Sequence, residues 1–461
     1  MTAVVPRPTF RDPTGYVEFT QEEVLRHVHS KDSEGTLRFL HSDLARKWQS
    51  SGQMIAGEIE ETPQGDLLIH HPRLFFPSYP WEWSPAQWQA AARLTLTLGS
   101  EAVAAGLLLK DATPLNVLFD GPRPVFVDVL SFDPREAGNP IWLAQGQFVR
   151  TFLLPLLAHR YLGWPLAASQ IYRDGYEPTQ LAAALGPLRR LHPKLLWPVT
   201  LPAWLDARQP AASKSKPAPR SMQRSPEFAT EMLLKNLRQL GGQIDSASAS
   251  GKPSRWSQYT CTAAHYSAAD HARKRKYVEH LLKEIAPATV LDIGANTGTY
   301  SMLAASAGAR VVALDTDMAA IDQLWMRALK ESKDILPLVV NIARPSPGLG
   351  WENSESMSFL DRAEQRFDLV MMLAVIHHLL LMDQIPLEQI AALAARLTRR
   401  HLLLEWVPQT DPMFQVLLRG RDALYAGLTC ERMQAAFASH FAVVSQCDLA
   451  NGRTLFLMEK R

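Results

Sequence analysis

The chain has 461 residues, 47% of them hydrophobic, and a formal net charge of +2 at pH 7. This length predicts two domains, with a third not excluded, each able to bury a full core. A charge so close to neutral argues against a large nucleic-acid interface, and we expect no nucleic-acid partner. The apolar run 148–162 contains arginine and proline and is too short to span a bilayer. Three cysteines without metal-ligand spacing, and a proline-rich start without a leader pattern, favour a cytoplasmic protein.

Two low-complexity stretches, residues 211–220 and 246–253, divide the chain. Between them, residues 227–240 have the apolar spacing of one amphipathic helix that ends at a glycine pair. We therefore expect three regions, which are an N-terminal domain over residues 1–205, a linker with one helix over 206–255 and a C-terminal domain over 256–461.

The N-terminal domain is expected to be α+β. A helix is predicted from Ser84 to about Ala105, because serine can cap it, proline follows, and a glutamine three residues on completes a capping box. The helix leads into a loop with Asp111 and Asn116, and the strand after it ends at Asp128. This arrangement resembles the catalytic loop and metal-binding aspartate of protein kinases and aminoglycoside phosphotransferases. The resemblance implies Asp111 as base, with Asn116 and Asp128 as magnesium ligands.

The kinase-like pattern is incomplete. No glycine-rich phosphate loop precedes it, no nucleotide-clamping lysine is identifiable, and Lys110 replaces the residue that usually precedes the loop aspartate. Two interpretations stay open. The domain is either an inactive kinase-like scaffold or a working phosphotransferase, and we favour the scaffold.

The most informative segment of the chain is Val290–Ser301. Its apolar start predicts a buried parallel strand, its glycines predict a tight turn, and its last residues begin a helix. Gly294 and Gly298 let the backbone approach a ligand where a Cβ would collide, and the amide-rich helix start can hold a carboxylate. Asp292 lies at the end of this strand, and a second strand ends at Asp315, 23 positions later. Both acids are therefore expected at the same edge of the sheet.

A dinucleotide fingerprint would need a glycine where Asn296 stands. The acid before the glycines and the G-x-x-x-G spacing instead resemble motif I of the class I S-adenosylmethionine-dependent methyltransferases. The resemblance implies S-adenosylmethionine as cofactor, with its ribose at Asp315 and its adenine beside Asn341 and Ile342. The cofactor-binding residues expected in all are Asp292, Gly294, Ala295, Asn296, Gly298, Asp315, Thr316, Asn341, Ile342 and Leu373. A strand–turn–helix with a purely structural role is the alternative.

The C-terminal domain alternates strands with helices. Strands are predicted at residues 290–293, 310–314, 336–340, 367–376 and 401–405, with a closing antiparallel pair at 441–445 and 454–458. Helices are predicted at residues 276–285, 300–307, 318–330 and 387–397. This order predicts a doubly wound α/β domain, and the terminal hairpin is typical of the Rossmann-like class I methyltransferase sheet.

Methyl transfer needs an aligned nucleophile and a proton acceptor, and the sequence signals no metal site. The candidate catalytic residues are His377 and His378, which follow the fourth strand, and Glu405, which ends the fifth. An imidazole titrates near neutral pH, so either histidine is a candidate general base. By resemblance to the methyltransferase pattern, His378 is the preferred wall of the site. A structural histidine is the alternative at each of the two positions.

Two further segments are candidates for the active site. The proline- and glycine-rich run 344–351 is expected to form an active-site loop, with an ordinary turn as the alternative. Trp256, Tyr259 and Tyr266 precede the domain and would either cover the ligands or simply pack.

The whole chain resembles a small group of bacterial methyltransferases related to the NoeA-like host-specific nodulation proteins. The segments that carry this resemblance are residues 79–83, 109–116, 126–132, 345–351 and 376–379. We expect a methyltransferase that acts on a small-molecule or glycan acceptor, with an N-terminal domain for substrate docking or scaffolding. Two alternatives stay open, which are a bifunctional kinase–methyltransferase and a non-catalytic S-adenosylmethionine-binding interaction protein.

Overall fold

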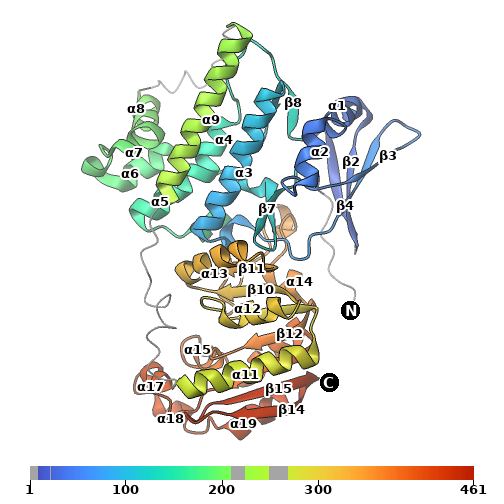
Figure 1. Ribbon diagram of the computed structural model, residues 1–461. Coiled ribbons are helices and arrows are strands. Elements are labelled where there is room, and N and C mark those ends of the chain that lie inside the picture. The colour runs from blue at the N-terminus through green and yellow to red at the C-terminus, as the bar shows by residue number, and fades with distance from the viewer. Residues whose placement is uncertain (1–8, 21, 209–223, 249–267) are drawn as a thin grey trace. The chain divides into compact units, whose positions relative to one another are not determined.

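The computed structural model describes residues 9–20, 22–208, 224–248 and 268–461. The chain divides into two units, one within residues 5–251 and one within residues 252–461 (Figure 1). The three aromatic residues proposed as a cover, Trp256, Tyr259 and Tyr266, lie outside the described ranges.

The C-terminal unit is built on one seven-stranded sheet. Its strands are β9 (Thr289–Ile293), β10 (Arg310–Asp315), β11 (Ile335–Val339), β12 (Phe367–Met372), β13 (Thr398–Trp406), β14 (Phe441–Asp448) and β15 (Thr454–Lys460). They lie in the order β11-β10-β9-β12-β13-β15-β14, and only β15 runs antiparallel to its neighbours. The middle residues of the central strands are mostly apolar and buried because helices cover both faces. The predicted doubly wound sheet with a terminal hairpin is confirmed.

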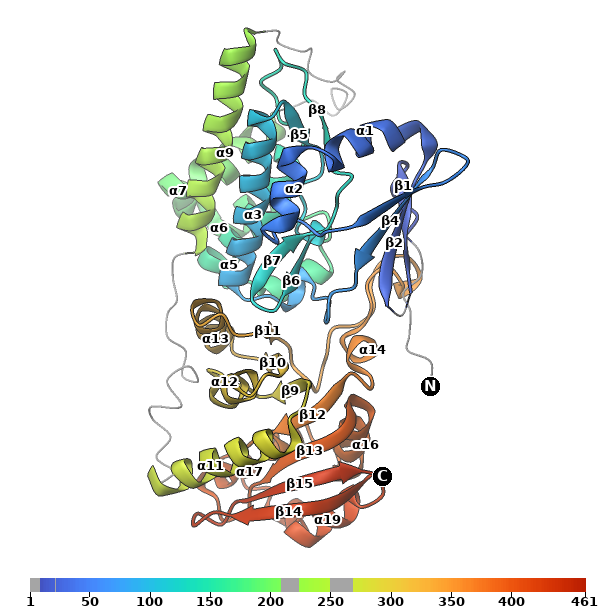
Figure 2. The ribbon, with the colours of Figure 1, turned by 45° about the vertical axis from the view of Figure 1, so that its right-hand side comes forward.

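Helices lie on both sides of this sheet (Figure 2). The first face carries α11 (Ala268–Ile285), α12 (Thr299–Ser306) and α13 (Met318–Lys330), whose apolar side chains share one core with those of β9, β10 and β12. The other face carries α16 (Leu387–Leu397) and α19 (Cys430–Phe437). The shorter helices are α14 (Phe359–Ala363), α15 (Ile376–Leu381), α17 (Pro412–Leu418) and α18 (Asp422–Tyr425).

The strand order reverses between β9 and β12. These two strands pair in parallel, and the chain continues from β9 to one side and from β12 to the other. A crevice at the carboxyl ends of the strands is expected at such a switch point. The predicted strand 367–376 is wrong in its length, since β12 ends at Met372. Ala374 has a φ of 57°, which stops the strand and turns the chain into α15.

The N-terminal unit begins with a four-stranded antiparallel sheet. Its strands are β1 (Gly15–Phe19), β2 (Glu23–Val28), β4 (Leu67–Pro72) and β3 (Glu58–Glu61), in that spatial order, with α1 (Ser30–Leu40) and α2 (Asp43–Ser50) between β2 and β3 in the chain. Helix α3 (Pro85–Ala104) follows, and the predicted capping box is confirmed. The Ser84 backbone N–H donates to Gln87 Oε1 at 3.0 Å, and the Gln87 N–H donates to Ser84 Oγ at 3.4 Å.

Short strands and helices complete this unit. Strands β5 (Leu107–Leu109) and β8 (Phe132–Pro134) pair with each other, as do β6 (Val117–Asp120) and β7 (Arg123–Phe126). The helices are α4 (Gln145–Phe148), α5 (Leu154–Leu162), α6 (Pro178–Arg189), α7 (Pro193–Leu195) and α8 (Leu201–Ala207). Among the described residues, no helix is long and apolar enough to cross a bilayer.

The helix predicted inside the linker is longer than expected and belongs to the N-terminal unit. It is α9 (Pro226–Ser248), and it packs lengthwise on α3 (Figure 1). Its apolar stripe, which includes Leu233, Leu237 and Ile244, is buried. The Asp245 carboxylate accepts a hydrogen bond from Gln89 at 2.9 Å. The low-complexity flanks suggested a linker, but a helix with a buried stripe is part of the fold.

Candidate functional site

The glycine turn after β9 adopts a left-handed backbone. Gly294 has a φ of 77° and Gly298 a φ of 79°, and Asn296 between them has a φ of 51°. A Cβ at Gly294 would meet the side chain of Val375, and one at Gly298 would meet Leu324. The sequence predicted a collision with a ligand, whereas in the structure a Cβ at either glycine would meet the chain's own side chains. The glycines therefore serve the turn and the packing beneath it.

The Asp315 carboxylate is fixed by main-chain amides at the end of β10. Its Oδ2 accepts from the Asn296 N–H at 2.8 Å, and its Oδ1 accepts from the Asp317 N–H at 2.9 Å. Burial raises the pKa of Asp315, and these amides oppose that rise. A carboxylate has about four lone-pair directions, so this group can still accept from two further donors. A vicinal diol is a ligand of that kind.

Asp292 is buried one strand away. Its Oδ2 accepts from Ser301 Oγ at 2.6 Å, and its side chain is inside the protein. Burial raises its pKa to about 6, and Ser301 and the Lys274 ammonium oppose the rise. The helix that carries Ser301 starts at Gly298, which offers no side-chain cap to the first-turn amides. An anionic ligand group can take that place.

The other predicted cofactor residues follow the carboxyl ends of four adjacent strands, so the fold gathers them along one edge. They are Ala295 after β9, Thr316 after β10, Asn341 and Ile342 after β11, and Leu373 after β12. The Asn341 side-chain oxygen, expected to accept from adenine, accepts from the Ala343 N–H at 2.9 Å.

His377 and His378 lie on the first turn of α15, not on a strand. His377 is 2% exposed, and its Nδ1 has no hydrogen-bond partner in the described part of the chain. His378 is half-buried, with Nδ1 3.3 Å from Met382 Sδ. The ring centroids are 4.3 Å apart. Burial lowers the pKa of both imidazoles, and the nearby Arg453 charge lowers each further, so both are neutral at pH 7.

Glu405 is a buried counter-ion and not an accessible base. It is 0% exposed, and its two oxygens lie 2.5 Å from Lys274 Nζ and 3.5 Å from Arg453 Nη1. Arg453 Nε also contacts Asp411 Oδ2 at 2.9 Å. The partners are 131 and 48 residues away in the chain, so the sequence alone suggested a free strand-end acid. The geometry corrects that interpretation.

The run 344–351 folds back on the chain that follows it. Leu349 forms an isolated bridge with Ser356, and Ser346 O accepts from the Phe359 N–H at 2.9 Å. Trp351 is 62% exposed. At its start, Arg344 Nη2 lies 3.3 Å from Asp383 Oδ1, just after α15. An active-site loop and an ordinary turn therefore both stay open for this run.

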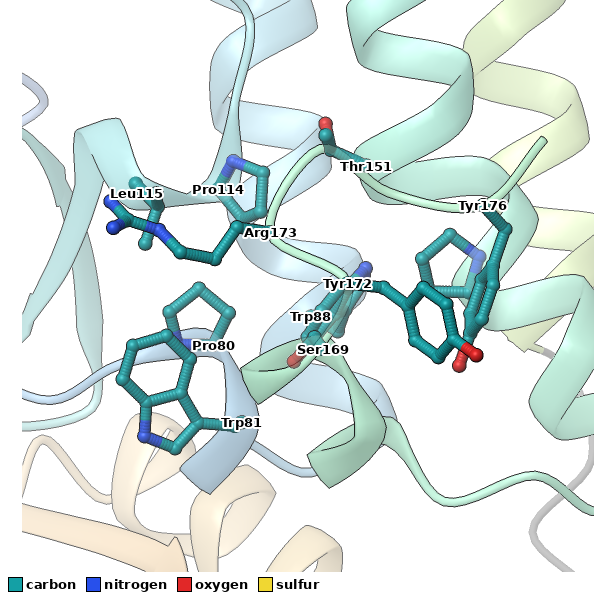
Figure 3. A pocket seen from close by; sticks show the side chains of 11 residues that line it. Pro80, Trp81, Trp88, Pro114, Leu115, Thr151, Ser169, Tyr172, Arg173 and Tyr176 are labelled. Carbon is teal, nitrogen blue, oxygen red and sulfur yellow. The ribbon is translucent and has the colours of Figure 1, made fainter. Parts of the chain in front are cut away.

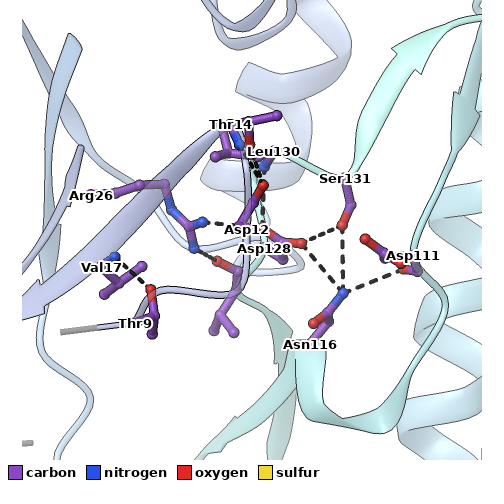
Figure 4. Close-up of polar contacts among 11 residues, drawn as sticks. Thr9, Asp12, Thr14, Val17, Arg26, Asp111, Asn116, Asp128, Leu130 and Ser131 are labelled. Atoms are coloured by element: carbon purple, nitrogen blue, oxygen red, sulfur yellow. Dashed lines mark hydrogen bonds and ion pairs between the residues drawn. The ribbon is translucent and has the colours of Figure 1, made fainter. Parts of the chain in front are cut away.

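In the N-terminal unit, the three kinase-like residues come together (Figure 4). Asn116 Nδ2 lies 3.4 Å from Asp128 Oδ2 and 3.4 Å from the Asp111 carbonyl oxygen. Asp128 also contacts two further side chains that the sequence did not predict. Its Oδ1 lies 3.1 Å from Arg26 Nη1, and its Oδ2 accepts from Ser131 Oγ. Because Arg26 is 102 residues away, on β2, no local pattern could identify it.

Asp111 itself contacts Gln147, whose Nε2 lies 3.4 Å from its Oδ1. Burial raises the pKa of Asp111, and the Asp128 charge raises it further. Within the described ranges, no three histidine, cysteine or acidic side chains gather in a way that could hold a metal ion.

A small pocket opens beside this loop. Its wall includes Leu115 of the loop and several aromatic and polar side chains, which are Trp81, Trp88, Ser169, Tyr172, Arg173 and Tyr176 (Figure 3). The enclosed part has a volume of about 20 Å³. Ser169 Oγ is buried there and has no partner among the residues that the structure describes. The pocket therefore offers aromatic faces together with hydrogen-bonding groups.

Comparison with known proteins identifies the family. A family model described as a methyltransferase domain matches residues 291–401, from β9 to β13. Over its full length the chain is 30% identical to the nodulation protein NoeA of Rhizobium meliloti (strain 1021), and the match covers 100% of this chain and 98% of that protein.

Two solved structures are more distant relatives. The N-methyltransferase NodS from Bradyrhizobium japonicum WM9 has a TM-score of 0.31 and 16% identity, over 42% of this chain and 98% of NodS. The bifunctional kinase-methyltransferase WbdD has a TM-score of 0.31 and 17% identity, over 44% of this chain and 41% of WbdD. Both likenesses are too distant to assign a function.

The methyltransferase domain and the full-length match agree with the sheet order and with the predicted cofactor. S-adenosylmethionine is the methyl donor of this enzyme. The chain belongs to the NoeA family of S-adenosylmethionine-dependent methyltransferases.

Proposed function

We propose that this enzyme methylates a small hydroxylated acceptor or a glycan, with the cofactor held along the carboxyl ends of β9 to β12. The observation that carries the proposal is the Asp315 carboxylate, fixed by two main-chain amides at 2.8 and 2.9 Å beside the uncapped start of α12. This edge offers an acceptor for hydroxyls next to donors for a carboxylate.

The remaining groups at this edge fit the other parts of S-adenosylmethionine. The buried Asp292 carboxylate suits a cationic amino group, because such a group would offset its desolvation. The buried side chains of Ile342 and Leu373 provide an apolar wall for adenine. The bound cofactor supplies an electrophilic methyl group, and the chain orients the acceptor and removes its proton.

His378 is our candidate for the proton acceptor. It is half-buried and neutral at pH 7, so an imidazole nitrogen can accept a proton from an acceptor hydroxyl. His377 is fully buried against it and is better suited to hold the first turn of α15 in place.

We propose that the N-terminal unit docks the acceptor and does not transfer phosphate. Asp128 is neutralised by the chain's own Arg26, while a phosphotransferase needs that aspartate for its metal. The pocket beside Leu115 encloses only about 20 Å³, close to the space of one water molecule, so a sugar would contact its outer rim, where the ring of Tyr172 is 43% exposed, and would not enter it. The bifunctional alternative is kept because Asp111, Asn116 and Asp128 do come together.

We place the reaction in the cytoplasm. Of the cysteines in the described ranges, Cys430 and Cys447 are free thiols, which suits a reducing compartment.

The test uses the full-length chain. Calorimetry with S-adenosylmethionine should give saturable binding, and incubation with radiolabelled cofactor and fractionated saccharides should transfer label to a small molecule. Binding without transfer to any saccharide fraction would contradict a glycan acceptor, and absence of binding would refute the proposed cofactor site.

A further inference from the structure

Four charged side chains form a continuous network of ion pairs inside the C-terminal unit. Lys274 on α11 contacts Glu405 at the end of β13, Glu405 contacts Arg453 before β15, and Arg453 contacts Asp411 before α17. All four side chains are at most 6% exposed. Two cations thus balance two anions, and they tie together elements that are far apart in sequence.

Lys274 also reaches the predicted cofactor edge. Its Nζ lies 4.9 Å from the centroid of the Tyr300 ring, in the first turn of α12. The next residue, Ser301, donates the 2.6 Å hydrogen bond to Asp292. The Lys274 charge also opposes the rise in the pKa of Asp292. The ammonium therefore acts on the turn and the carboxylate at the edge where the cofactor is proposed to bind.

Stability alone is a weak reason for such a buried pair. Removing an ammonium and a carboxylate from water costs several kcal/mol or more, and hydrophobic residues of similar size often stabilise a fold equally well. Burial lowers the pKa of Lys274, and the contact with Glu405 opposes this lowering. The ion pair therefore offsets the desolvation of the ammonium. Its position against Tyr300 gives it a second role.

We propose that Lys274 is a positioning residue of the cofactor site. Its ammonium, anchored by Glu405, holds Tyr300 and the first turn of α12 in place and offsets the charge of Asp292. This inference rests on the proposed function, because it assigns a residue to the same S-adenosylmethionine site.

The experiment compares single and paired substitutions in the full-length protein. Lys274→Met removes the cation that lies 2.5 Å from Glu405, while Lys274→Met combined with Glu405→Met removes one charge of each sign and keeps the Arg453–Asp411 pair. Lys274→Arg is the conservative variant. Lys283→Met with Glu279→Met removes an exposed pair, 2.9 Å long, from the same helix and is the matched control.

We expect the single Lys274→Met variant to lose thermal stability and to bind S-adenosylmethionine about tenfold more weakly or worse. The double variant should recover its melting temperature but not its cofactor affinity, and Lys274→Arg should recover part of that affinity. The surface control should change neither quantity. A double variant that regains both stability and wild-type affinity would make Lys274 purely structural. Absence of binding in the wild type would overturn the proposed function together with this inference.

Discussion

The two units each bring acidic side chains together, but they neutralise them differently. At the end of β10, Asp315 is held by main-chain amides and keeps lone pairs that a hydroxyl donor can use. In the N-terminal unit, Asp128 is occupied by Arg26, Ser131 and Asn116, all side chains of the same unit. The first arrangement leaves acceptor capacity that a ligand can use, and the second is completed by the protein.

The spacing of acidic residues along the chain therefore does not by itself define a ligand-binding site. Both sets of residues matched a family pattern, and both are gathered by the fold. What separates them is a cation, Arg26, that lies 102 residues from Asp128 and satisfies it internally. The predictions below test this contrast.

The largest expected effect is on catalysis. His378→Ala should lower the rate of methyl transfer by about 10²–10⁴, the usual range for loss of a general base, with cofactor affinity nearly unchanged. In contrast, Asp111→Asn in the other unit should leave the rate unchanged. Single-turnover kinetics and calorimetry on both variants measure this. Equal losses of rate and cofactor affinity in His378→Ala would instead mark the histidine as a structural wall.

The next effect is on stability. Glu405→Ala should reduce the free energy of unfolding by about 3–5 kcal/mol, because it removes the buried carboxylate that lies 2.5 Å from Lys274 Nζ. Urea titration followed by circular dichroism measures it. Glu388→Ala, which breaks an exposed pair with Arg432, is the control and should cost about 1 kcal/mol or less. A similar small loss in both variants would contradict the assigned role of Glu405.

A smaller effect is expected on cofactor binding. Asp315→Ala should weaken S-adenosylmethionine binding by about 1–3 kcal/mol, the scale for removing a buried acceptor from its donor. Isothermal calorimetry on the full-length chain measures it, with Asp334→Ala as a surface control, since Asp334 pairs with Arg310 on an exposed face. Unchanged affinity in Asp315→Ala would show that Asp315 does not bind the ribose.

The smallest effect is a pH dependence. The Asp292 carboxyl has a pKa of about 6, above its usual value, so cofactor affinity should fall as pH drops below 6 and the carboxylate that pairs with an amino group is protonated. In the unliganded protein the raised pKa stabilises the fold below the unfolded-state pKa, and this contribution is lost as pH rises through 6. Asp292→Asn should therefore remove the pH dependence of binding without lowering apo stability at pH 7. Affinity that falls equally with pH in both proteins would exclude Asp292.

The fold of the C-terminal unit could be predicted because its signals are local. The apolar strands and the glycine turn specify each element within a dozen residues, and the 23-residue separation of Asp292 and Asp315 fixes their shared edge. Strand length was the exception. The left-handed residue Ala374 ends β12, and an alanine gives no warning of that conformation.

The side-chain partners could not be predicted because they are distant in sequence. The residues around Glu405 in the sequence give no sign that Lys274 is its partner, and those around Asp128 give no sign of Arg26. The packing of Val375 and Leu324 against the motif glycines is likewise a tertiary contact. Sequence patterns locate the acidic residues, but the folded structure determines which of them form ion pairs with distant side chains.

Thermal-shift measurements on the full-length protein with S-adenosylmethionine and, separately, with ATP and magnesium distinguish the two units. We expect S-adenosylmethionine to raise the melting temperature in a concentration-dependent way and ATP with magnesium to leave it unchanged. A clear rise with ATP and magnesium that disappears in Asp128→Ala would contradict this expectation and would make the bifunctional kinase–methyltransferase the leading interpretation.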